Sequence, residues 1–131
     1  MLGELVVNRW MTPDGTVLQS KHVHDYVTYS DADGNFYYID GGTHYCKISG
    51  NMKSLCLHYG DEHSEIRKYF SWKSYGKDGK QLGTWLKLQD MGTDHIEAIL
   101  DTQKHIFGTV VELVFKDELK YREDYVSTST T

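Results

Sequence analysis

The sequence has little cysteine, no long hydrophobic run and fewer positive than negative charges. Its two cysteines, Cys46 and Cys56, are too few for a disulfide framework. No segment approaches the ~18 consecutive apolar residues of a membrane span. The first residues also lack the basic region and apolar run of a signal peptide. We therefore expect no membrane association and a location in a reducing cytoplasm.

The charge balance argues against one broad class of partner. Fourteen Lys and Arg residues face 19 Asp and Glu residues, which gives a formal net charge of −5. A general nucleic-acid binder needs a basic surface for its phosphate contacts. The sequence thus predicts no general nucleic-acid binding, although a local basic pocket for a small ligand remains open.

Aromatic residues are abundant instead, with ten Tyr, four Phe and three Trp in 131 residues. Tyrosine combines apolar area with a polar edge. This content suits strands that pack one face and offer the other face to a partner. The length predicts one domain with a core of its own.

The first half of the chain predicts an antiparallel meander of four or five strands. Strands are expected at residues 4–10, from Val17 onward, at 24–30, at 43–48 and at 54–59. Asp33-Gly34 indicates a hairpin, and a two-residue loop there would pair Tyr29 with Tyr38 and Val27 with Asp40. Gly41-Gly42 then permits a sharp reversal or a close backbone approach.

The second half changes to helical spacing. A short helix is predicted at 62–70 with Asp61 as N-cap, then a loop at 72–82 and a strand at 84–88. Thr93 is the expected N-cap of the next helix, and the spacing of apolar residues predicts the last helix at 109–123. Glu112–Lys116 and Glu118–Arg122 are expected as ion pairs on its exposed side. We predict a single α+β domain over 1–126, with two or three C-terminal helices packed on an N-terminal antiparallel sheet, and a disordered polar tail at 127–131.

The densest polar constellation lies in residues 20–42. Alternation puts His22, His24, Tyr26 and Thr28 on one face of the strand and Asp25, Val27 and Tyr29 on the other. His24, Asp25 and Asp40 are candidates for partner contact or for an acid–base group. No catalytic motif accompanies them, so we interpret this cluster as chiefly structural and assign no catalytic residue.

Metal binding is a weaker hypothesis from the same region. His22-x-His24 and His44-x-Cys46 each put two ligands on one side of a strand, and four such ligands would suit tetrahedral zinc. The spacing is of low specificity, and we expect no metal or other cofactor.

Residues 72–80 predict a recognition loop. Aromatic rings and basic groups are interleaved there and just before it, a combination that can stack a base and neutralise phosphate. The candidate ligand-binding residues are Arg67, Trp72, Tyr75, Lys77 and Lys80. The alternative interpretation is an exposed, solvated loop.

Several motifs together resemble a family of small uncharacterised proteins of tailed bacteriophages. They are Ser20-Lys21-His22-x-His24-Asp25-Tyr26-Val27, Asp40-Gly41-Gly42-x-x-Tyr45, Ile66-Arg67-x-x-Phe70-x-Trp72 and the run from His95 to Gln103. The resemblance spans roughly residues 8–123. Similar phage proteins carry cysteine pairs like a zinc ribbon, whereas this chain has Trp10-Met11-Thr12-Pro13 and Ser30-Asp31 there, which argues against zinc.

The resemblance implies an accessory protein in the cytoplasm of an infected bacterial host. We expect a non-enzymatic protein that binds and inhibits a host or anti-phage defence component. One alternative is a sponge for a phosphorylated, cyclic nucleotide signal, and a further one is a small metal-dependent hydrolase or nuclease. Whether the chain forms a homo-oligomer stays open.

Overall fold

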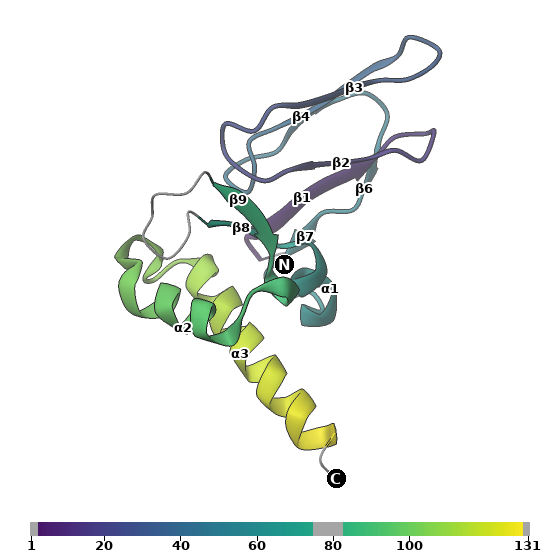
Figure 1. Ribbon diagram of the computed structural model, residues 1–131. Helices are drawn as coiled ribbons and strands as arrows, with labels where there is room; N and C mark the ends of the chain where they lie inside the picture. The colour runs from purple at the N-terminus through teal and green to yellow at the C-terminus, as the bar shows by residue number, and fades with distance from the viewer. Residues whose placement is uncertain (1–2, 75–82, 130–131) are drawn as a thin grey trace. The chain divides into compact units, whose positions relative to one another are not determined.

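The protein is described by a computed structural model for residues 3–74 and 83–129. Contacts divide the chain into two compact units, Met1–Gly60 and Asp61–Thr131, which we call the first and second units. The first unit consists of strands, and the second contains three α-helices and a β-hairpin (Figure 1). This order confirms the α+β class, while the single domain over 1–126 stays a prediction. Among the described helices, none has the length and apolar character to cross a membrane.

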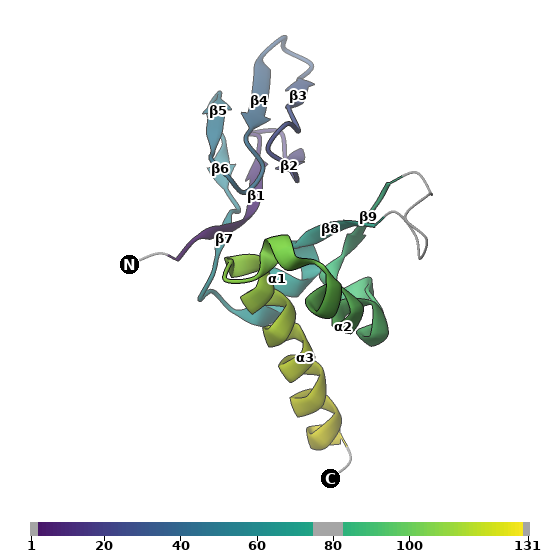
Figure 2. The same ribbon diagram turned by 90° about the vertical axis from the view of Figure 1, so that its left-hand side faces the viewer.

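Two small antiparallel sheets form the first unit, where the sequence suggested one meander. One sheet has the order β2-β1-β6, made of β1 (Leu5–Met11), β2 (Val17–Ser20) and β6 (Lys53–Ser54), and β7 (Leu57–His58) also pairs with β1. The other has the order β3-β4-β5, made of β3 (Val27–Ser30), β4 (Phe36–Asp40) and β5 (Lys47–Ser49). Figures 1 and 2 show the sheets as two layers of this unit.

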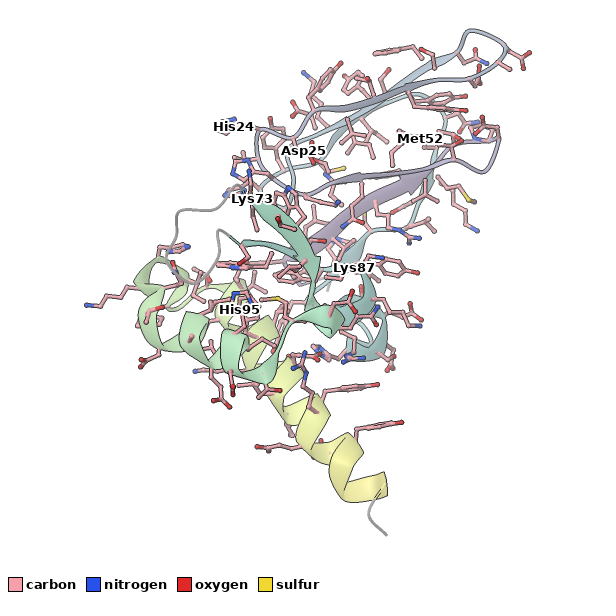
Figure 3. All side chains as sticks on the ribbon, in the orientation of Figure 1. His24, Asp25, Met52, Lys73, Lys87 and His95 are labelled. Carbon is pink, nitrogen blue, oxygen red and sulfur yellow. The ribbon has the colours of Figure 1, made fainter. Side chains whose placement is uncertain are left out.

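The core of the first unit lies between these layers. Leu18 from β2 packs with Tyr37 and Ile39 from β4, and all three are buried. Partly buried side chains complete this cluster, namely Trp10, Val27, Tyr29, Ile48 and Met52. Figure 3 shows Met52 between the two layers. The sandwich thus buries one face of each short sheet, which isolated strands of this length could not do.

The β3–β4 hairpin differs by one residue from the predicted pairing. Tyr29 pairs with Tyr37 and Val27 with Ile39, so the prediction of Tyr38 and Asp40 as their partners was wrong. The loop has five residues, 31–35, because the Asp31 carboxylate accepts hydrogen bonds from the backbone of Asp33 and Asn35. An odd shift in register exchanges the two faces of β4, so Tyr38 and Asp40 point away from the core.

The second unit contains α1 (His63–Tyr69), β8 (Ser71–Ser74), β9 (Thr84–Lys87), α2 (Thr93–Thr102) and α3 (Val110–Ser129). Two short 3₁₀ helices, η1 (Leu88–Asp90) and η2 (Lys104–Ile106), join the later elements. Strand β8 occupies positions predicted as loop. Helix α3 continues past the predicted end at residue 123 and includes residues 127–129 of the predicted tail.

The helices of the second unit pack around Phe115 of α3. Its ring contacts Phe70 edge-on at 5.9 Å and Trp72 of β8 at 5.2 Å between centroids. Ile96 and Ile99 of α2 are buried in the same unit. The N-cap predictions for Asp61 and Thr93 were wrong by one residue each, since Glu62 and Gly92 occupy the cap positions.

Candidate functional site

The outer face of the β3-β4-β5 sheet carries a group of aromatic side chains, which we call the aromatic face: Tyr26, Phe36, Tyr38 and Tyr45. Phe36 and Tyr38 alternate along β4 with the buried Tyr37 and Ile39. Tyr26 precedes β3, and its ring lies 5.4 Å from that of Tyr38, centroid to centroid. The Phe36 and Tyr38 rings are 6.4 Å apart. The rings of Tyr26, Tyr38 and Phe36 therefore form one continuous surface, and Tyr45 is tied to the same strand through Asp40.

The aromatic face is unusually open for such large side chains. Tyr26 is 54% exposed, Phe36 52% and Tyr45 48%. Single exposed apolar residues are ordinary, but contiguous ones mark interaction surfaces. Because the opposite face of the same sheet already fills the core, these rings cannot turn inward.

Polar groups border the aromatic face at its Tyr45 end. The Tyr45 hydroxyl donates a 3.1 Å hydrogen bond to Oδ2 of Asp40, and this bond raises the pKa of Tyr45. Asp40 is the cross-strand partner of Lys47 on β5. The charges at this end are therefore of both signs, a carboxylate on β4 and a lysine opposite it on β5.

A tight turn fixes this end of the face. Gly41 and Gly42 have φ values of +106° and +55°. A Cβ on Gly42 would lie 2.3 Å from the carbonyl carbon of His22, and one on Gly41 would lie 2.2 Å from the Tyr45 carbonyl oxygen. The predicted close backbone approach at these glycines is confirmed.

Buried polar groups hold the turn in place. The Gly42 N–H donates to Oγ of Ser20 at 2.9 Å, and Nδ2 of Asn8 donates to the Gly42 carbonyl at 2.9 Å. Ser20 Oγ in turn donates to the carbonyl of Asp25 at 2.6 Å. Asn8 and Ser20 are almost fully buried, so this network fixes the two ends of the 20–42 stretch against each other.

The predicted polar cluster is spread over separate contacts. Asp25 accepts a hydrogen bond from the backbone N–H of Lys21, and Asp40 accepts one from Tyr45. His24 is exposed, and its backbone N–H donates to Nδ1 of His22. Figure 3 shows His24 and Asp25 at the same end of the first unit. Among the described contacts, no hydrogen bond joins His24, Asp25 and Asp40 to one another.

In the described residues, the candidate metal ligands do not come together at one site. The rings of His22 and His24 lie 5.4 Å apart in the turn before β3, outside the strand in which alternation had placed them. Within the described ranges, no group of three or more His, Cys, Asp or Glu residues is arranged to hold an ion. His22, His24, His44 and Cys46 therefore do not form such a group.

The predicted recognition residues of the second unit are engaged in packing where they are described. Nε and Nη2 of Arg67 each donate to a carboxylate oxygen of Glu118 at 2.9 Å. Trp72 packs on Phe115 and stacks with His105. Tyr75, Lys77 and Lys80 lie outside the described residues.

Glu118 lies in a different environment from the one predicted from the sequence. Its side chain is fully buried, so its expected place on the exposed side of α3 was wrong. His63, Arg67 and Arg122 all hydrogen-bond to its two oxygens, at distances of 2.6–2.9 Å. Burial raises the pKa of Glu118, but these hydrogen bonds outweigh it and lower the pKa to about 2.

The Glu118 cluster connects three parts of the second unit. Arg122 also donates to the carbonyls of Leu88 and Met91 and to Oγ1 of Thr93. The carboxylate oxygens are occupied by donors from α1 and α3, which leaves little capacity for a substrate. This arrangement is that of a structural ion cluster. In the sequence, the burial of Glu118 is indicated by its spacing: it follows the buried Phe115 by three residues and the buried Val114 by four, which places all three on one side of the helix.

Comparison with known proteins adds no assignment to this geometry. No family model matches the sequence, and neither a curated protein nor a solved structure matches it. The aromatic face of the first unit is therefore the candidate site on its own physical features.

Proposed function

We propose that the protein is a non-enzymatic binding protein whose aromatic face contacts a protein partner. The observation that carries this proposal is the set of neighbouring rings exposed on the outer face of the β3-β4-β5 sheet. Tyr and Phe supply much contact area at a small cost in side-chain entropy, and such residues dominate binding energy at interfaces. Their placement on a sheet held by a buried core also supports a preformed surface.

The resemblance to small phage proteins supplies the class of partner. We propose a host or anti-phage defence component, met in the cytoplasm of an infected bacterium. A mixed border of hydroxyl, carboxylate and ammonium groups supports a protein surface as the ligand, since such rims are polar and pair with varied groups.

The charges near the face favour a protein over a phosphorylated nucleotide. The Asp40 carboxylate accepts a hydrogen bond from the Tyr45 hydroxyl. A carboxylate at this position would repel the phosphate of a nucleotide. Arg67 and Trp72, the described residues expected to hold a nucleotide, are engaged with Glu118 and Phe115.

The separation of the acid–base candidates supports a function in binding. A histidine base that is oriented by a carboxylate lies within hydrogen-bond reach of that carboxylate. In the described part of the chain, the Asp25 carboxylate accepts from the Lys21 N–H and the Asp40 carboxylate accepts from the Tyr45 hydroxyl, and no hydrogen bond joins either carboxylate to His24.

The experiment is affinity capture from infected cells with matched variants. The face variant combines Tyr26→Ser with Phe36→Ser, and the control combines Phe107→Ser with Tyr125→Ser on the second unit, where both rings are exposed. Neither pair belongs to the buried core, so both variants should fold, as circular dichroism would verify.

We expect one protein to co-purify with the wild type and the control but not with the face variant. Binding of that purified partner should weaken by about 30-fold or more in the face variant, the loss typical of a hot spot. Equal capture by the face variant would refute the proposal. Retention of a nucleotide, detected by mass spectrometry of the eluate, would favour the sponge instead.

A further inference from the structure

The two cysteines of the first unit meet at one buried oxygen atom. Cys46 lies just before β5, and Cys56 lies in the link between β6 and β7. Sγ of Cys46 is 3.4 Å from Oδ1 of Asn8, and Sγ of Cys56 is 3.8 Å from the same atom. The thiols are therefore neighbours in space, although ten positions separate them in the sequence.

The backbone around each thiol is fixed by sheet hydrogen bonds. Lys47, next to Cys46, pairs with Asp40 in the β4–β5 ladder. Leu55, next to Cys56, donates its N–H to the carbonyl of Arg9 at 2.8 Å, and Cys56 Sγ is 3.5 Å from that same carbonyl oxygen. The proximity of the thiols thus follows from the strands and does not depend on a loose loop.

We propose that Cys46 and Cys56 form an oxidisable dithiol, a site that closes to an intramolecular disulfide when a small-molecule disulfide such as oxidised glutathione is the oxidant. This inference is independent of the aromatic face and of its partner. It assigns to both cysteines a role in redox modification.

The reaction balances as two thiol–disulfide exchanges. The thiolate of Cys46, the exposed cysteine, attacks one sulfur of oxidised glutathione and releases one glutathione thiolate. Sγ of Cys56 then attacks the Cys46 sulfur of the mixed disulfide and releases the second glutathione. Both protein thiols lose their protons and are oxidised, and one glutathione disulfide is reduced to two thiols.

The surroundings shape the rate and the outcome. Although Cys46 as a whole is exposed, its sulfur lies against the buried Asn8. The resulting partial desolvation, followed by the neighbouring Cys56 thiol, raises the pKa of Cys46, so the first exchange should be slow at neutral pH and faster in alkali. Asn8 Oδ1 would keep its 3.0 Å hydrogen bond from Nε1 of Trp10 after both thiol donors were gone. Closing the link therefore leaves no buried polar atom of Asn8 unpaired.

The test is incubation of the full-length native protein in glutathione buffers of increasing oxidising strength, followed by mass spectrometry. We expect a product lighter by two hydrogen atoms, in which peptide mapping joins Cys46 to Cys56. Because the folded state already brings the thiols together, the link should form more readily in native than in urea-unfolded protein, by about tenfold or more in equilibrium constant. The oxidised protein should also melt at a higher temperature.

Single variants provide the controls. Cys56→Ser should accumulate a stable glutathione adduct on Cys46, because the second exchange has lost its nucleophile, and its melting temperature should not rise on oxidation. Glutathione adducts on both cysteines of the native protein, dimers joined through a cysteine, or a link that forms no more readily than in urea would each overturn the proposal.

Discussion

Removal of the Glu118 charge tests whether the buried ion cluster holds the second unit together. We consider Glu118→Gln, which keeps the size of the side chain and removes its charge. Arg67 and Arg122 would then remain largely buried without a counterion, since each is 21% exposed. One Gln amide group cannot accept the hydrogen bonds that three donors now make to the two carboxylate oxygens.

The magnitude can be approached in two ways. Breaking a buried ion pair by removing one partner typically costs about 3–5 kcal/mol. Independently, a pKa lowered from 4.5 to about 2 corresponds to roughly 3 kcal/mol of stabilisation by the ionised form. We therefore expect Glu118→Gln to lower the free energy of unfolding by about 3 kcal/mol at neutral pH.

The assay is urea unfolding followed by far-ultraviolet circular dichroism, with Glu65→Gln as the matched control. Glu65 pairs with Lys68 on the surface of α1, 3.4 Å apart, and both side chains are 49% exposed. Exposed pairs of this kind contribute about 0.3–0.5 kcal/mol. The same substitution at the two sites should thus differ several-fold in its effect.

The dependence of stability on pH provides a second test, and the direction of the change follows from the lowered pKa of Glu118. The folded-state pKa of Glu118 is depressed, so its stabilisation is present above about pH 4.5 and is lost as the pH falls toward 2. The difference in stability between wild type and Glu118→Gln should therefore shrink over this interval. A difference that stays constant with pH, or a cost no larger than that of Glu65→Gln, would refute the cluster as a source of stability.

Two further predictions concern the buried turn network of the first unit. Gly42→Ala should lower the free energy of unfolding by about 1–3 kcal/mol more than Gly15→Ala does, as measured by thermal or urea unfolding. Both glycines have positive φ, but only at Gly42 would the new Cβ meet the backbone of His22. Equal losses of stability would show that the turn can relax. Asn8→Ala should lower the free energy of unfolding by at least about 1–3 kcal/mol because it leaves buried partners unpaired. Asn51→Ala, at an exposed site, should change stability little. An equally small effect at Asn8 would contradict a stabilising role for the network.

The fold class and most elements could be predicted because their signals are local. The Pro13-Asp14-Gly15 turn and the 3.6-residue spacing of α2 need no information from distant parts of the chain. The division of the strands into two sheets could not be predicted in this way. It depends on β1 pairing with β6 and β7, more than 40 positions away, and short strands carry no local mark of such partners.

The burial of Glu118 shows a different limit. Its spacing from Arg122 fits an exposed i,i+4 pair as well as a buried one. Its burial depends on hydrogen bonds from His63 and Arg67 of α1, about 50 positions earlier in the sequence. The energetic reason for burying a carboxylate lies in those distant donors, so a reading of α3 alone favours the exposed side.

The candidate site depends on a shift of one residue in the pairing of β3 with β4. With a two-residue loop at Asp33-Gly34, Tyr38 and Asp40 would share a face with Tyr29 and Val27 and point to the core. The five-residue loop places Tyr37 and Ile39 there instead. Its cause is the Asp31 carboxylate, which binds the loop backbone and widens the turn beyond the Asp-Gly pair. The aromatic face on the β3-β4-β5 sheet is therefore a consequence of turn chemistry, and Asp31 determines which tyrosine of β4 a partner can reach.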